Sequence, residues 1–172
     1  MKRERESLSQ FSFLPPEDAA LVNLMRHFVA EASRIYEVRT GVTMEEALQI
    51  RSPRDAYEFF RAEMEDLDQE QLRTIHLNTK QRILSSRLLY QGSVHTTVVR
   101  VAEIFRHAII DNASGIIICH NHPSGDPTPS PEDAALTREI IKAGQLLDIE
   151  VLDHIVIGKG KFVSLKERGL GF

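Results

Sequence analysis

The chain has 172 residues, and 21 Lys and Arg against 25 Asp and Glu give it a formal net charge of −4 with His neutral. Its 7 His and single Cys exclude a disulfide framework and a Cys-rich structural zinc site, so any metal would be held by His and carboxylate. The mildly acidic balance argues against tight nucleic-acid binding, and the lack of a long apolar run or a signal peptide predicts a cytoplasmic protein without a membrane span.

The first part of the chain is predicted to be helical. Residues 1–16 show no regular pattern, but apolar residues then recur at helical spacing and predict a helix over 17–36 that ends before Gly41. The recurring residues are Leu21, Leu24, Met25, Phe28, Ala32 and Ile35. A further short helix is expected over 44–49. We therefore expect a short N-terminal helical segment over residues 1–50.

A clear helix start follows this segment. In Ser52-Pro53-Arg54-Asp55, Ser is a favoured N-cap, Pro fits the first helical position, and the acid suits the positive first turn. The apolar stripe of the predicted helix is Tyr57, Phe60, Met64 and Leu67. This helix opens the second part of the chain.

Strands and helices alternate in the rest of the chain. The expected elements are strands over 72–77 and 83–90 joined by a turn at Asn78-Thr79-Lys80, an extended stretch over 92–99, a helix over 101–110, a strand over 115–119, a Pro-rich loop over 123–131, a helix over 134–147, and strands over 151–157 and 162–165. The wholly apolar strand over 115–119 is typical of a sheet centre. The helix over 134–147 is expected to bury Leu136, Ile140, Ala143 and Leu147. Residues 51–172 thus read as one α/β domain.

Two His after the central strand carry the clearest chemical signal. His120 and His122 are two residues apart, and such residues point to the same side of an extended backbone, so their imidazoles converge. Asp133 falls in the first turn of the next helix, where the loop could return it to the strand end. Two nitrogens, one carboxylate oxygen and a water form the pattern of a catalytic zinc site, which also needs a carboxylate as general base.

A simpler interpretation competes with the zinc site. Ser130-Pro131-Glu132-Asp133 has the same form as Ser52-Pro53-Arg54-Asp55, so a helix start alone would explain Ser130 and Asp133. What favours a metal is the combination of a core strand that ends in two His with a loop stiffened by four prolines, because such a loop has no packing rationale.

The same residues resemble a known family. His120-x-His122-x7-Ser130-x2-Asp133 matches the JAMM motif of JAB/MPN metallopeptidases, and the whole string HNHPSGDPTPSPED resembles the signature of the bacterial RadC family. Segments 77–80, 152–158 and 161–167 also look like segments of that family, so the resemblance covers residues 51–170. It implies a JAB/MPN-like, cytidine-deaminase-like fold, in which a mixed sheet is flanked by helices.

The resemblance also implies roles for individual residues. His120, His122 and Asp133 would bind Zn²⁺, and Ser130 would stabilise the oxyanion as zinc-bound water attacks a peptide or isopeptide carbonyl of a peptide or protein substrate. Glu70, ahead of the strand over 72–77, is placed as the general base, with Glu103 as the alternative. Cys119 and His154 lie near the motif, and we interpret them as a small core residue and a hydrogen-bonded strand His.

Two departures from the family pattern bear on function. The chain lacks the longer N-terminal helix-hairpin-helix region of RadC-like chains, which argues against DNA binding, and residues 99–103 replace the family's His-Pro-Arg-Glu turn. The rival to a hydrolase is a non-enzymatic interaction module associated with DNA repair. The sequence is also compatible with a homo-oligomer.

Overall fold

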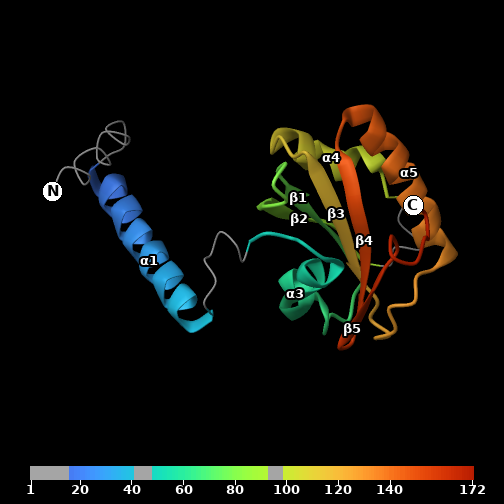
Figure 1. The fold of residues 1–172 in the computed structure, drawn as a ribbon, viewed down its shortest axis with the longest axis horizontal. Coiled ribbons are helices and arrows are strands. Elements are labelled where there is room, and N and C mark those ends of the chain that lie inside the picture. The colour runs from blue at the N-terminus through green and yellow to red at the C-terminus, as the bar shows by residue number, and fades with distance from the viewer. Residues whose placement is uncertain (1–15, 41–47, 93–98) are drawn as a thin grey trace. The chain divides into compact units, whose positions relative to one another are not determined.

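The computed structural model describes residues 16–40, 48–92 and 99–172 (Figure 1). The chain divides into two compact units, residues 1–47 and 48–172. In the first unit, α1 (Pro16–Thr40) continues beyond the predicted end at residue 36, because no helix-breaking residue precedes Gly41. The short helix expected over 44–49 lies mostly outside the described residues, and its last residue, Gln49, instead forms an isolated antiparallel bridge with Arg82.

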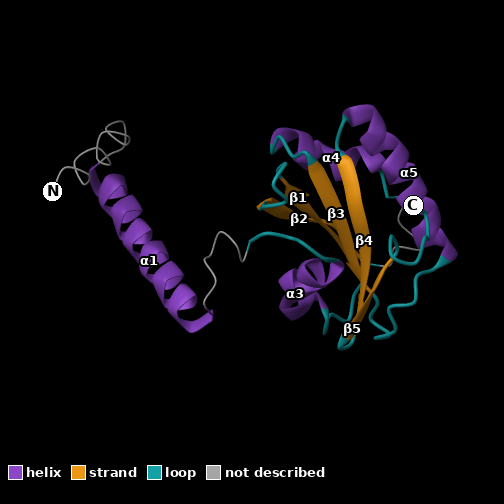
Figure 2. Cartoon of the chain, in the orientation of Figure 1, coloured by secondary structure: helices purple, strands orange, loops and turns teal. Residues whose placement is uncertain are grey.

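The second unit is a mixed α/β domain, as predicted (Figure 2). Its elements are α3 (Pro53–Met64), β1 (Gln71–Leu77), β2 (Ile83–Gln91), α4 (Val101–Ile110), β3 (Gly115–Asn121), α5 (Pro131–Leu147), β4 (Glu150–Gly158) and β5 (Lys161–Ser164). The strands form one sheet in the order β2-β1-β3-β4-β5. Only β3 and β4 are parallel, and the other neighbours are antiparallel. Within the described residues, no helix is long and apolar enough to cross a membrane.

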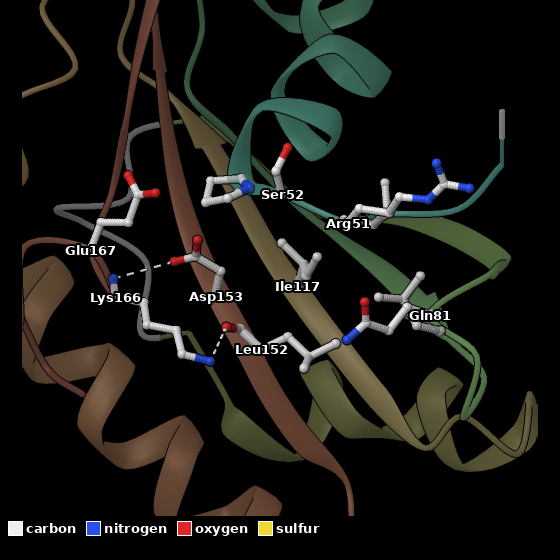
Figure 3. Close-up of a pocket in the computed structure, with 11 residues that line it drawn as sticks. Arg51, Ser52, Gln81, Ile117, Leu152, Asp153, Lys166 and Glu167 are labelled. Carbon is white, nitrogen blue, oxygen red and sulfur yellow. Dashed lines mark hydrogen bonds between the residues drawn. The ribbon is translucent and has the colours of Figure 1, made fainter. Parts of the chain in front are cut away.

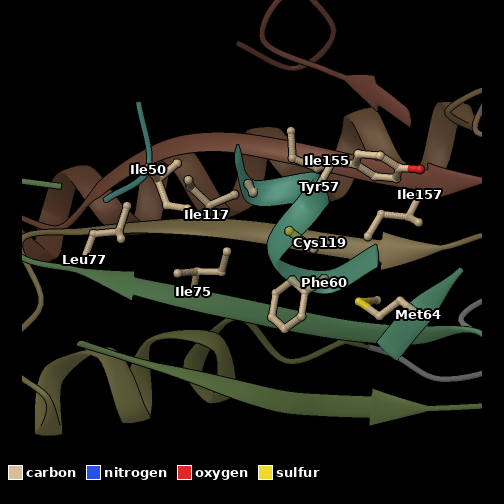
Figure 4. Close-up of a cluster of buried hydrophobic side chains, with 11 residues drawn as sticks. Ile50, Tyr57, Phe60, Met64, Ile75, Leu77, Ile117, Cys119, Ile155 and Ile157 are labelled. Atoms are coloured by element: carbon tan, nitrogen blue, oxygen red, sulfur yellow. The ribbon is translucent and has the colours of Figure 1, made fainter. Parts of the chain in front are cut away.

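Helices cover both faces of this sheet, which explains the apolar run of β3. Ile117 and Cys119 pack in the cluster under α3 (Figure 4), whereas Ile116 and Ile118 pack in the cluster with α4 and α5. Alternate residues of one strand thus enter two different cores. Cys119 is fully buried, and burial raises the pKa of its thiol well above the ordinary value, so it is a core residue as predicted.

The hairpin turn between β1 and β2 also forms where the sequence predicts it. The Asn78 side-chain oxygen accepts hydrogen bonds from the amides of Lys80, at 2.9 Å, and Arg82, at 3.1 Å. Gln81 closes the turn with a φ of 57°. Asn is suited to such turns because its side chain bonds backbone groups a few residues ahead.

Three predicted boundaries or faces need correction near the His motif. β3 continues through Asn121, so His120 lies within the strand and not after it, and α5 begins at Pro131, three residues earlier than predicted. Leu147 is 44% exposed. Ile140 is buried as predicted and Leu136 and Ala143 are partly buried, but the other buried residues of α5 are Asp133, Thr137 and Gly144. Gly144 allows α5 to lie close to the backbone that follows it, because a Cβ at this position would lie 2.5 Å from the carbonyl oxygen of Ile149.

Candidate metal centre

The candidate site lies at the carboxyl end of the central strand. His120 is the penultimate residue of β3, His122 follows the strand, and Asp133 lies in the first turn of α5. Because β3 and β4 run parallel, their carboxyl ends share one edge of the sheet, and α/β sheets bind ligands at such edges.

The structure brings these three side chains together. The Nε2 atoms of His120 and His122 are 3.1 Å apart. The Asp133 carboxylate lies 3.4 Å from His120 Nε2 through Oδ1 and 3.8 Å from His122 Nε2 through Oδ2. The side chains of His120 and Asp133 are only 1% and 9% exposed, while that of His122 is 19% exposed. The cluster is therefore open to solvent mainly at His122.

A chain of hydrogen bonds determines which nitrogen of His120 carries the proton. The Thr137 hydroxyl lies 2.6 Å from the Asp133 carbonyl oxygen, which can only accept, so Thr137 donates its one proton there. Thr137 Oγ1 must then accept from Nδ1 of His154, at 2.7 Å. This leaves Nε2 of His154 to accept from Nδ1 of His120, at 2.8 Å. Neutral His120 therefore presents an unprotonated Nε2 to Asp133 and His122.

The same reasoning applies to His122. Its Nδ1 lies 2.8 Å from the carbonyl oxygen of Asp126, so Nδ1 donates there and the neutral ring has its lone pair on Nε2. Two Nε2 lone pairs 3.1 Å apart cannot hydrogen-bond to each other. A shared cation satisfies both, and metal-binding His side chains typically donate their other ring nitrogen in this way. The residues present therefore fit a metal ion.

Asp133 serves as helix cap and faces the His pair at once. Its Oδ2 accepts hydrogen bonds from the amide and hydroxyl of Ser130, both at 2.7 Å, while Oδ1 faces His120. Burial raises the pKa of the Asp133 carboxyl, whereas the hydrogen bonds from the Ser130 amide and hydroxyl lower it. Asp133 is thus an anionic group at neutral pH. The interpretation of the Ser-Pro-x-Asp motif as a helix start and its interpretation as part of a metal site are therefore compatible.

The Ser130 hydroxyl is committed to this cap. It donates to Asp133 Oδ2 and accepts from the Asp133 amide at 3.1 Å. The matching motif ahead of α3 makes a similar cap, in which the Ser52 amide and hydroxyl donate to Asp55 Oδ2 at 2.8 and 3.1 Å. An oxyanion role for Ser130 requires its hydroxyl to turn away from Asp133.

Glu70 is distant from the two His in the sequence but lies close to them in the structure. One oxygen of its carboxylate and one ring nitrogen from each of His120 and His122 all lie within 4.8 Å of one another. The pairing of β1 with β3 causes this, because Leu72 lies opposite His120. The alternative base, Glu103, accepts a hydrogen bond from Tyr90 instead and does not belong to the group of Glu70, His120 and His122 that could hold a metal ion among the described residues.

Sequence reasoning missed how His154 and Thr137 take part in the site. It interpreted His154 as a hydrogen-bonded strand residue, and that holds, but one of its partners is His120. Burial lowers the pKa of His154 to about 3, so this ring is neutral at neutral pH. The only available signal was the spacing of Asp133 and Thr137, four residues apart and so on one face of a helix.

A separate cavity of about 370 Å³ opens on the α3 face of the sheet (Figure 3). Its apolar floor includes Leu77 and Ile117, and none of the residues of the His cluster lines it. The Asp153 carboxylate at its wall accepts a hydrogen bond from the Ser164 hydroxyl at 2.7 Å, and burial raises the pKa of Asp153. This cavity lies apart from the candidate metal centre.

Comparison with known proteins identifies the family. The family model described as RadC-like JAB domain matches residues 50–170. The chain belongs to the RadC family. This confirms the resemblance found in the His120–Asp133 motif, and the mixed sheet flanked by helices agrees with it.

Relatives of this RadC-family chain are named UPF0758 proteins, a name that states no activity. One from Roseiflexus sp. (strain RS-1) is 59% identical over 128 residues, which cover 74% of this chain and 55% of that protein. One from Chloroflexus aggregans is 51% identical over 130 residues, or 76% of this chain and 57% of that protein. One from Clostridium beijerinckii is 46% identical over 142 residues, or 83% and 62%. The chain thus spans little more than half the length of these relatives.

Proposed function

We propose that this RadC-family domain is a zinc-dependent hydrolase that cleaves a peptide or isopeptide bond in a peptide or protein substrate. The observation that carries the proposal is the approach of the Nε2 atoms of His120 and His122 to 3.1 Å, while the Nδ1 atom of each ring lies 2.8 Å from another hydrogen-bonding partner. Asp133 and Glu70 both approach this pair. A metal ion shared by the two Nε2 atoms would account for their close approach beside two carboxylates.

The donor set favours zinc. Two imidazole nitrogens and a carboxylate oxygen, from His120, His122 and Asp133, are ligands that Zn²⁺ accepts in tetrahedral catalytic sites, where the fourth position stays open. When bound, zinc acidifies a water molecule and polarises a carbonyl group. The partial exposure of His122 supports an open position on the side that solvent reaches.

The chain's own side chains supply the remaining chemistry in this proposal. Glu70 holds the attacking water and takes its proton, because its carboxylate lies within 4.8 Å of both His ring nitrogens. Ser130 orients Asp133 through Oδ2 in the resting site. If its hydroxyl turns toward the substrate, it donates to the developing oxyanion.

The test combines metal content with cleavage. Protein purified without added metal is expected to hold about one zinc per chain, or to take it up on titration, and to cleave members of a peptide library. Glu70→Gln should keep the metal and lose cleavage, while Glu103→Gln, a matched change outside the cluster, should keep both. Zinc binding without cleavage would favour the non-enzymatic interaction module. Failure to bind zinc would refute the metal centre itself.

A further inference from the structure

Asn121 lies between the two His of the motif, and its side chain forms hydrogen bonds with the backbone of another segment. It is 1% exposed. Its Oδ1 accepts a hydrogen bond from the amide of Gln71 at 2.8 Å, and its Nδ2 donates to the carbonyl of Gln69 at 3.1 Å. These two residues flank Glu70, so one side chain holds the backbone on both sides of it.

An amide group is suited to this arrangement because it offers an acceptor and donors on one rigid plane. An Asp side chain of the same shape would keep the acceptor for Gln71 but lose the donor for Gln69. A third bond completes the clamp, since the carbonyl of Glu70 accepts from the amide of Gly92 at 2.9 Å. The backbone of residues 69–71 is thus held at three consecutive positions.

We propose that Asn121 is a positioning residue that aims the Glu70 carboxylate at the metal centre. The inference rests on the proposed role of Glu70 in a metal-dependent hydrolase. Asn121 adjoins both His in the chain, so the strand that carries a metal ligand also sets the place of the general base. A small shift of the 69–71 backbone would then move the carboxylate relative to His120 and His122.

The experiment uses Co²⁺ as the probe, because zinc has no visible spectrum whereas the visible bands of Co²⁺ respond to the groups around it. The full chain is loaded with Co²⁺ as wild type, Glu70→Gln and Asn121→Ala, and the visible spectra are compared at one pH. We expect Asn121→Ala to bind Co²⁺, since His120, His122 and Asp133 remain, and to shift the spectrum in the same direction as Glu70→Gln.

Asn78→Ala is the matched control. Asn78 also makes two side-chain bonds to backbone amides, but at the hairpin turn at the other end of β1. Both Asn→Ala variants should lower the stability of the metal-free protein, while Asn78→Ala should keep the wild-type spectrum. A purely structural role for Asn121 predicts the same result for both variants.

A second variant covers the case in which Asn121→Ala does not fold. Asn121→Asp keeps the bond from Gln71 and loses the bond to Gln69, so its spectrum should shift part of the way. A wild-type spectrum in the folded Asn121 variants, when Glu70→Gln does shift it, would overturn the inference and leave the proposed function standing. If the wild type binds no Co²⁺, or Glu70→Gln leaves its spectrum unchanged, the proposed role of Glu70 fails and this inference fails with it.

Discussion

Thr137→Val tests the hydrogen-bond chain that sets the protonation of His120. Valine keeps the shape of threonine but removes the hydroxyl, which is fully buried between the Asp133 carbonyl and Nδ1 of His154. The carbonyl still has the backbone ladder of α5 as a donor. The group left without a partner is the Nδ1–H of His154.

The expected magnitude follows from that single unpaired group. A buried donor without an acceptor costs about 1–3 kcal/mol. His154 avoids this cost if its proton moves to Nε2, which then donates to Nδ1 of His120. The proton of His120 then lies on Nε2, the atom that faces His122 and Asp133. Metal binding must reverse this change, so we expect zinc affinity to fall by about 10- to 100-fold, as for other partners of metal-bound His.

The assay is a competition titration with a zinc chelator, together with urea unfolding of the metal-free protein. Thr74→Val is the matched control, because Thr74 is also fully buried and its hydroxyl lies 3.0 Å from Nε2 of His76, outside the candidate metal centre. Both variants should lose unfolding free energy, but only Thr137→Val should lose zinc affinity. Equal affinity in the wild type and both variants would refute the assigned protonation of His120.

Three further predictions concern the caps, the packing of α5 and the response to acid. Ser130→Ala and Ser52→Ala should each lower the unfolding free energy by about 1 kcal/mol. Only Ser130→Ala should also weaken zinc binding in the competition titration. Equal zinc affinities of the two variants would contradict the role of Ser130 in both the helix cap and the orientation of Asp133. Gly144→Ala places a Cβ 2.5 Å from a backbone oxygen, so urea unfolding should show a loss of about 1–3 kcal/mol. Burial, only partly offset by Asp111, lowers the pKa of His76. On acidification the His76 ring is therefore protonated more readily in the unfolded chain than in the folded one, so the unfolding free energy should fall as the pH drops below about 6.5. His76→Gln should make that fall shallower in urea titrations, and an unchanged slope would show that His76 is not its source.

Local patterns predicted most of the domain because burial follows backbone periodicity. The apolar run of β3 reflects a strand buried between two cores, and the stripe of α3 reflects a helix facing one of them. Both patterns can be recognised within a few residues of sequence. The convergence of His120 and His122 follows from the same geometry. The buried face of α5 was misjudged because a search for apolar residues passes over Thr137 and Gly144, which are buried for hydrogen bonding and for close approach.

Contacts between distant strands were beyond such patterns. Glu70 reaches the His pair only because β1 lies antiparallel to β3 with Leu72 opposite His120. No local rule fixes that register, and the resemblance to a family was what pointed to Glu70. The same holds for His154, which meets His120 because β4 lies parallel to β3.

The two Ser-Pro-x-Asp segments show why a motif needs its neighbours. Both begin a helix, and in both an Asp oxygen accepts bonds from the Ser amide and hydroxyl. Only the second follows a strand with His120 and His122 at its carboxyl end, so of the two Asp only Asp133 has imidazoles within 4 Å of its carboxylate. The cap occupies Oδ2 and leaves Oδ1 toward His120, which favours binding of a metal through one oxygen. The helix start and the proposed metal ligand are therefore one structure, in which the cap holds Oδ2 and leaves Oδ1 directed toward His120.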